Sequence, residues 1–272
     1  MSRSFLRPKC RTWFIGSVSV GTGSVALFAV LASSAPWSPG RFWGLTFGTL
    51  ATVVFVLDGL YPLRRRLMGW PFGTAQRWLQ FHIYGGALAL LFVLIHVGFS
   101  LPNGQFGWWL FGLTLWSVVS GLVGVWLQKW IPTVLASQLS VEALYVRIPE
   151  MADRLQSEAD AVARGASDLL ERFYSGEIRP SLAGVAPSWS FLVGLAGDRE
   201  RRLTPFRNVA QFVSEDDQDR LKDLEAIVTE KLELDAQYSL QRALRLWLPL
   251  HLFPAIVLLG LLAVHIFAVL YL

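Results

Sequence analysis

Three long segments of the 272-residue chain carry no charged side chain: residues 12–40, 78–128 and 246–272. A helix needs about 20 apolar residues to cross the hydrocarbon core of a bilayer. Because the backbone in lipid must satisfy its own hydrogen bonds, such segments are expected to be helical. The turn Pro102-Asn103-Gly104 divides the longest of them in two.

The fold class that follows is all-α, an integral membrane bundle of five transmembrane helices. Residues 42–63 add an apolar segment to those already described. The five helices are expected at about residues 13–35, 42–63, 78–101, 106–131 and 246–272.

A polar segment, residues 131–245, interrupts this pattern between the fourth and fifth helices. It holds 19 of the 20 acidic and 14 of the 24 basic residues, for a net charge of −5. The rest of the chain has ten basic residues and one acidic residue. We therefore expect three parts: membrane helices one to four in 1–130, a mainly helical cytoplasmic domain in 131–245, and the fifth membrane helix in 246–272. Within the domain, 178–205 contains Pro and Gly and is expected to be irregular. The helical pattern that starts at Ser214 can run on into the last membrane helix.

Basic residues near the helix ends predict the orientation in the membrane. They cluster on one side, whereas the opposite side has only Arg41. Lys and Arg favour cytoplasmic loops, so the N-terminus and residues 131–245 are expected in the cytoplasm and the C-terminus outside. The clustered residues are Arg3, Arg7, Lys9, Arg11, Arg64, Arg65, Arg66, Arg77 and Lys129.

The first helix also has a second interpretation. A basic start, an apolar run and Ser33-Ser34-Ala35 resemble a signal peptide with a small-residue cleavage site. The apolar run is longer than usual for a signal peptide, so we favour a retained helix, and cleavage remains the alternative.

Several classes of function lack their motifs in this sequence. Cys10 is the single cysteine, which excludes an internal disulfide, a cysteine-ligated iron–sulfur cluster and a covalent c-type haem. The chain has no G-x-G-x-x-G after a strand and no P-loop, so nothing indicates a nicotinamide, flavin or ATP site. The isoelectric point near 9.5 reflects basic residues at helix ends. We therefore expect contact with membrane lipid and no nucleic-acid partner.

All four histidines fall in predicted membrane helices. His82 and His96 are 14 residues apart on the third helix, and His251 and His265 are 14 apart on the fifth. That spacing is close to four helical turns, or about 21 Å of rise, so both members of a pair project from nearly one face. The third and fifth helices run in the same direction. His82 and His251 are therefore expected at one depth, near the inner side, and His96 and His265 at another, near the outer side.

Matched depth predicts two metal-ligating pairs. Neutral imidazole is a standard axial ligand of haem iron. We expect two b-type haems, an inner one ligated by His82 and His251 and an outer one ligated by His96 and His265. We expect no catalytic side chains beyond these ligands.

Other readings of the histidines stay open. A single intramembrane histidine is more often a hydrogen-bonded packing residue, and a row of histidines can line a metal or proton pathway. Transport pathways usually add intramembrane carboxylates, and Asp58 is the only one here. Asp58 is interpreted first as an ion pair with Arg64–Arg66 and second as a proton donor to a quinone. The inner-side residues Arg77, Arg242 and Arg245 could pair with haem propionates, although topology explains them equally well.

Glycines on these helices permit close approach of a planar ring, although we favour ordinary small-residue helix packing for any single one. They are Gly44, Gly48, Gly85, Gly86, Gly98, Gly121 and Gly124.

The two H-x13-H pairs on parallel helices resemble those of the dihaem b-type transmembrane cytochromes. This group includes cytochrome b of the quinol–cytochrome c reductases and the membrane domains of ferric reductases and NADPH oxidases. The resemblance covers helices two to five. This chain departs from the reductases in lacking a flavin and nicotinamide module, and from the quinol complexes in lacking a Pro-Glu motif. The insertion at 131–245 fits neither group.

A finer resemblance lies in the segments 127–132 and 234–247, which look like a bacterial cytochrome b subgroup that works with separate redox subunits. It implies a multi-pass protein of the bacterial inner (cytoplasmic) membrane that belongs to an oxidoreductase complex. The implied partners are a multihaem c-type cytochrome, an iron–sulfur protein or a flavin protein, with a quinone as a further candidate.

The favoured function is electron transfer across the bilayer, between a quinone or redox partner on one side and a partner on the other. The alternatives are a quinone-reactive oxidoreductase subunit, a His-lined metal or proton transporter, and a membrane sensor.

Overall fold

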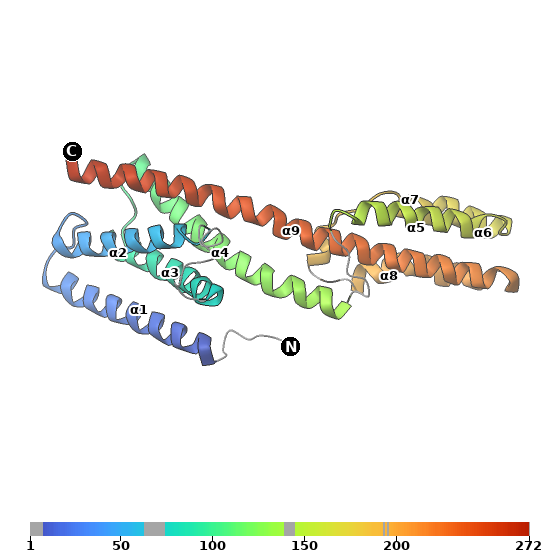
Figure 1. Ribbon diagram of the computed structural model, residues 1–272, viewed down its shortest axis with the longest axis horizontal. Coiled ribbons are helices and arrows are strands. Elements are labelled where there is room, and N and C mark those ends of the chain that lie inside the picture. Colours follow the sequence, from blue (N-terminus) through green and yellow to red (C-terminus); the bar gives the residue numbers. More distant parts are fainter. Residues whose placement is uncertain (1–7, 63–73, 139–144, 193, 195, 272) are drawn as a thin grey trace. The chain divides into compact units, whose positions relative to one another are not determined.

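The computed structural model describes residues 8–62, 74–138, 145–192, 194 and 196–271, and in these residues it is helical without a β-strand (Figure 1). Five of the helices are long and apolar enough to cross a membrane. They are α1 (Pro8–Ser34), α2 (Phe42–Gly59), α3 (Ala75–His96), α4 (Gln105–Gln138) and α9 (Glu215–Tyr271).

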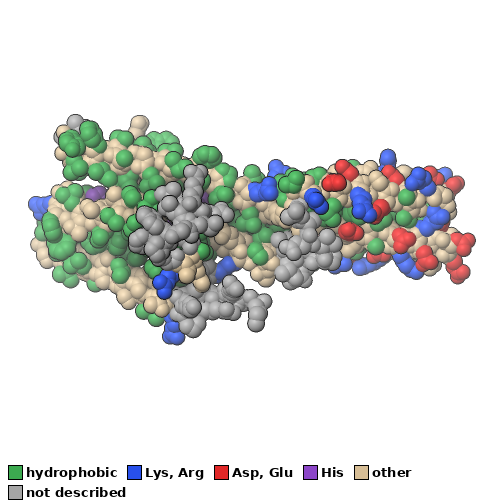
Figure 2. Space-filling model, viewed as in Figure 1, with side chains coloured by type: hydrophobic (Ala, Val, Ile, Leu, Met, Phe, Trp, Pro, Cys, Tyr) green, Lys and Arg blue, Asp and Glu red, His purple; other side chains and the backbone are tan. Residues whose placement is uncertain are grey.

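The chain divides into two compact units. One, here called the membrane unit, consists of Met1–Trp126 and Trp247–Leu272, and the other, the polar unit, of Leu127–Leu246. Hydrophobic side chains cover much of the visible face of the membrane unit, whereas charged side chains gather on the polar unit (Figure 2). An apolar exterior is what a helix bundle surrounded by lipid requires. Arg3, Arg7 and Arg64–Arg66, on which the predicted orientation partly rests, lie outside the described residues.

The core of the membrane unit lies between α2 and α3, which pack closely along their lengths. Phe47 and Ala51 of α2 are buried against Ala89 and Phe92 of α3, and Leu258 of α9 joins the same cluster. Small residues alternate with aromatic ones here, which lets two helices approach closely. Helix α1 also packs against α3 (Figure 1).

Helix α3 ends earlier than the sequence predicts. The apolar run suggested a helix to Leu101, but the last helical residue is His96. Gly98 adopts a positive φ of 66°. Its amide donates to the carbonyl of Ile95 (2.9 Å), and the amide of Phe99 donates to that of Leu94 (2.8 Å). This pair of bonds is a Schellman motif, which satisfies the last carbonyls and stops the helix.

The polar unit is built from short helices packed on the first half of α9. They are α5 (Ile148–Ala163), α6 (Asp168–Phe173), a π-helical turn η2 (Tyr174–Ile178), α7 (Arg179–Leu182), a 3-10 turn η3 (Trp189–Leu192) and α8 (Ala196–Ala210). The prediction of an irregular segment at 178–205 was wrong for most of its length. Helix α8 tolerates Pro205 and is held by Phe206, which is buried against Phe173.

The last predicted membrane helix is the end of a longer element. Helix α9 runs unbroken from Glu215 to Tyr271 and includes Pro249 and Pro254. Each of these prolines removes one backbone hydrogen bond from the helix. The sequence pattern predicts that the helix starting near Ser214 can continue into the last membrane helix, and the structure confirms this continuity.

A buried ionic cluster joins α9 to the rest of the polar unit. The Nζ of Lys231 lies 2.6 Å from Oδ1 of Asp235, and both side chains are fully buried. Asp235 also accepts the backbone N–H of Ala186 (3.0 Å) and lies 3.2 Å from Arg202 Nη1. Several donors therefore compensate the cost of burying this carboxylate.

The cluster yields a stability prediction. Removing one partner of a buried ion pair costs about 3–5 kcal/mol because the other charge stays buried. Asp235→Ala should therefore lower the unfolding free energy by that amount, and Lys231→Met by less, because Asp235 keeps Arg202 and Ala186. Denaturant unfolding followed by circular dichroism measures both. Lys222→Met is the matched control, because its ion pair with Asp219 is exposed. Equal effects of Asp235→Ala and the control would contradict the prediction.

Candidate functional site

The structure brings His82 and His251 together within the membrane unit. Their ring centroids are 6.1 Å apart and their planes are nearly perpendicular, at 88°. Two imidazoles that bind one metal ion from opposite sides, through bonds of about 2 Å, have centroids about 6 Å apart. The separation therefore suits a shared metal ion.

The second pair lies at the other level. His265 of α9 is within electrostatic range of His96 of α3. Its ring also packs near Phe106 of α4, at 6.2 Å between centroids. His251 thus lies near His82, and His265 interacts electrostatically with His96. That each of these pairs shares a metal ion stays a prediction.

A hydrogen bond fixes the orientation of the His251 ring. Its Nδ1 lies 2.9 Å from Oγ of Ser120 on α4. The same oxygen lies 2.6 Å from the carbonyl oxygen of Trp116. A hydroxyl that donates to that carbonyl can accept the Nδ1–H of His251. Trp247 stacks on the same imidazole (5.5 Å, 14°) and donates its indole N–H to the Ser120 carbonyl (2.7 Å).

His96 is held by α2 in a similar way. Its Nδ1 lies 2.8 Å from the carbonyl oxygen of Gly44. A carbonyl only accepts, so this Nδ1 also carries the hydrogen. Trp37 donates its indole N–H to the His96 carbonyl (3.1 Å), which closes the end of α3.

His82 faces a carboxylate. Its Nδ1 lies 3.6 Å from Oδ1 of Asp58 on α2, and the Asp58 side chain is 9% exposed. Among the described residues, neither of these two buried atoms has a hydrogen-bond partner, so the contact between them is electrostatic. The ring of Tyr61 stacks on His82, with centroids 5.1 Å apart and an interplanar angle of 18°.

Sequence reasoning missed this role of Asp58. It paired Asp58 with Arg64–Arg66, which lie outside the described residues, whereas the structure places it beside His82. The sequence could have indicated this contact, because Asp58 and His82 are both expected near the inner ends of consecutive membrane helices.

In all three histidines Nδ1 is the ring nitrogen that faces an oxygen atom of a neighbouring helix, from Asp58, Gly44 and Ser120 respectively. Histidines that ligate metals almost always direct the other ring N–H to a carboxylate, carbonyl or similar acceptor. With Nδ1 on such an acceptor, Nε2 is the ring nitrogen that could bind a metal ion.

Two glycines singled out from the sequence lie directly against the histidines. A Cβ built on Gly48 would be 2.9 Å from Nδ1 of His96, and one on Gly121 would be 3.4 Å from Cε1 of His251. Gly124 has the same relation to the Trp247 ring, and Gly85 and Gly86 to the Asp58 carboxylate. At Gly48 and Gly124 the missing Cβ makes room for a side chain of a neighbouring helix, whereas at the other three glycines a Cβ would make ordinary contact with the His251 ring or the Asp58 carboxylate.

Arg245, a candidate partner for haem propionates, is engaged within the polar unit. Its guanidinium lies 4.0 Å from the centroid of the Tyr145 ring. Tyr145 in turn stacks on Tyr238, at 4.6 Å between centroids.

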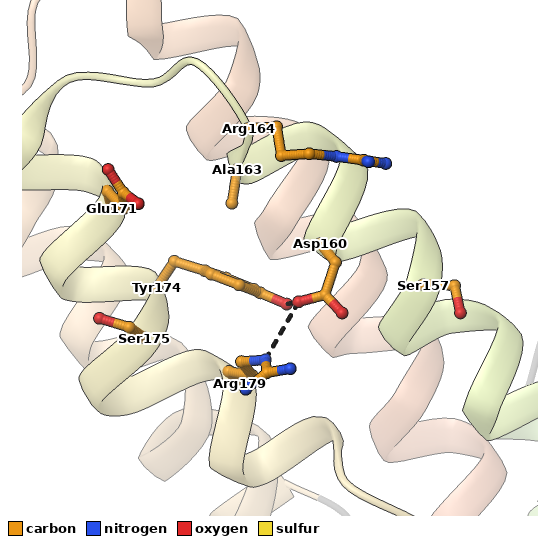
Figure 3. A pocket seen from close by; sticks show the side chains of 8 residues that line it. All are labelled: Ser157, Asp160, Ala163, Arg164, Glu171, Tyr174, Ser175 and Arg179. Carbon is orange, nitrogen blue, oxygen red and sulfur yellow. Dashed lines mark hydrogen bonds and ion pairs between the residues drawn. The ribbon is translucent and has the colours of Figure 1, made fainter.

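The polar unit has an open cavity of about 540 Å³ beside the π-helical turn η2 (Figure 3). Asp160 is at its centre and accepts hydrogen bonds from Tyr174 Oη (2.5 Å) and Arg179 Nε (3.1 Å). The Tyr174 hydrogen bond and the Arg179 guanidinium hold the pKa of the Asp160 carboxyl below its usual range. The carboxylate is thus occupied by the protein itself, and we interpret the cluster as a tie between α5 and the η2–α7 segment.

Comparisons of the chain with protein families, curated proteins and solved structures found no match. Within the described residues, no three or more His, Cys, Asp or Glu side chains gather into a group that could hold a metal ion. The functional argument therefore depends on the histidine pairs and their neighbours.

The contact of Gly48 with His96 can be tested. In Gly48→Ala the added methyl would force the imidazole away from the Gly44 carbonyl, at an overpacking cost of about 1–3 kcal/mol. Gly16→Ala, with nothing within 4 Å of its Cβ, is the control. It should be neutral or stabilising by up to about 1 kcal/mol, because Ala favours helix over Gly. Thermal unfolding of the detergent-solubilised protein measures both, and shifts of the same sign would contradict the predicted contact.

Proposed function

We propose that this chain is a membrane cytochrome b that carries two bis-histidine haems and transfers electrons across the bilayer. The observation that carries the proposal is the state of the imidazoles. Nδ1 lies 2.8 Å from a carbonyl oxygen in His96, 2.9 Å from a hydroxyl in His251 and 3.6 Å from a carboxylate in His82. The fourth histidine, His265, interacts electrostatically with His96. The 6.1 Å separation of the His82 and His251 rings supports a shared iron.

The residues divide into two sets. His82 and His251 would hold the inner haem, and His96 and His265 the outer one. When bound, haem supplies one-electron redox chemistry whose potential depends on axial ligands, burial and nearby charge. The chain's own contribution is to fix the ring orientations through Ser120 and the Gly44 carbonyl.

Electrons would enter and leave through other molecules. We propose a bacterial inner-membrane location, with the N-terminus and residues 131–245 in the cytoplasm. The proposed partners are separate redox subunits, such as a multihaem c-type cytochrome, an iron–sulfur protein or a flavin protein, or a membrane quinone. The chain would then be the electron-transfer subunit of an oxidoreductase complex.

A second candidate function is a His-lined proton or metal pathway. The observation that favours it is the Asp58–His82 pair, since ionisable pairs inside membranes often mark such pathways. Protein purified from haem-replete cells distinguishes the two, because a transporter would lack the Soret absorption band.

Haem content tests the proposal directly. The wild-type chain should bind two haems, as measured by haem extraction and protein quantification. His82→Ala and His251→Ala should each lose one haem and keep the outer one, whereas His96→Ala and His265→Ala should lose the outer one. Redox titration identifies which haem remains.

Thr46→Ala is the control for these variants. The Thr46 hydroxyl bonds to the carbonyl of Phe42 in its own helix (2.8 Å), so its loss should leave both haems in place. A wild-type protein without haem would refute the proposal. Loss of different haems from His82→Ala and His251→Ala would refute the pairing.

A further inference from the structure

Asp58 distinguishes the two histidine pairs electrostatically. His96 and His251 direct Nδ1 to neutral acceptors, a backbone carbonyl and a hydroxyl. His82 directs its Nδ1 to the carboxylate of Asp58. A buried carboxylate in a membrane helix is costly and is usually retained for function.

The surroundings hold this pair in place. Tyr61 stacks on the face of the His82 ring and so turns an edge of the ring toward Asp58. On α3, Gly85 and Gly86 lie against the carboxylate: an added Cβ would be in ordinary contact with it, 3.4 Å from Oδ1 and 3.6 Å from Oδ2, respectively. The Asp58–His82 contact therefore belongs to the packing of α2 on α3.

A carboxylate at this distance changes the ligand strength of His82. A nearby negative charge favours the positively charged form of the ring and so makes the imidazole a more basic ligand. Its negative charge also acts across 3.6 Å in a medium of low dielectric, where Coulomb interactions are strong. Both effects favour the more positively charged, oxidised state of a metal bound at Nε2.

We propose that Asp58 is a positioning residue that lowers the reduction potential of the haem held by His82 and His251 below that of the haem held by His96 and His265. The inference rests on the proposed function. Its consequence is directional, because electrons would reside preferentially at the outer pair and the chain would favour transfer from the inner to the outer side.

Spectroscopic redox titration of purified wild type and Asp58→Asn tests the inference. The asparagine keeps the side-chain volume and removes the charge. We expect one of the two reduction equilibria to shift toward the reduced state by about tenfold or more, which is about 59 mV or more for a one-electron couple. The other should stay unchanged. Asp160→Asn, which removes a carboxylate of the polar unit, is the matched control and should shift neither.

Two further measurements separate tuning from a merely structural role. Asp58→Glu restores a carboxylate and should bring the shifted potential back toward the wild-type value. The low-spin ferric signal of one haem in electron paramagnetic resonance should change in Asp58→Asn and not in Asp160→Asn.

The inference is overturned if Asp58→Asn keeps two haems and neither potential moves. It is also overturned if Asp58→Asn and Asp58→Glu both lose the haem, because Asp58 would then be needed for assembly. Both results leave the proposed function intact, whereas a wild-type chain without haem refutes the proposed function itself.

Discussion

The scarcity of water inside a bilayer is the constraint on which the structure depends. Each polar group that enters the membrane must find its partner in the protein, because an unsatisfied one costs several kcal/mol. The backbone meets this requirement by forming helices. In His96 and His251, one of the two ring nitrogens has a polar partner: the Gly44 carbonyl in His96 and the Ser120 hydroxyl in His251. The nitrogen that remains on each ring is the one that a metal ion would satisfy, which links the folding problem to the proposed cofactor.

The same constraint explains why each helix that carries histidines packs beside a helix that supplies polar partners for them. The α3 histidines are supported by α2, through Asp58 and the Gly44 carbonyl, and His251 of α9 is supported by α4, through Ser120. Gly48 lets α2 approach the His96 ring more closely than a residue with a Cβ would allow. Two helices would thus supply the ligands and two would hold them, which is the division between ligand and supporting residues seen in metal sites generally.

The polar unit is under a different constraint, because water is available to it and can solvate the charged side chains on its surface. Lys231 and Asp235 depart furthest from this, as both are fully buried. Arg202 and the amide of Ala186 complete the surroundings of that carboxylate. Such clusters contribute little net stability but penalise any arrangement that leaves a member unpaired. In this unit the cluster ties α8 and the 183–188 segment to α9.

The sequence by itself determined the five apolar helices, the polar segment between the last two, and the four histidines at equal spacing, because hydropathy and helical periodicity are local properties. Tertiary structure decided where α3 ends, since the Gly98 turn is closed by two backbone bonds and covered by Trp37. It also decided that α8 forms around Pro205, because Phe206 gains a buried contact. The partners of His82, His96 and His251 come from helices that are distant in sequence, so only packing could reveal them. Asp58 shows the difference most clearly: its contact with His82 joins residues 24 positions apart on two helices, so it follows from the packing of α2 on α3.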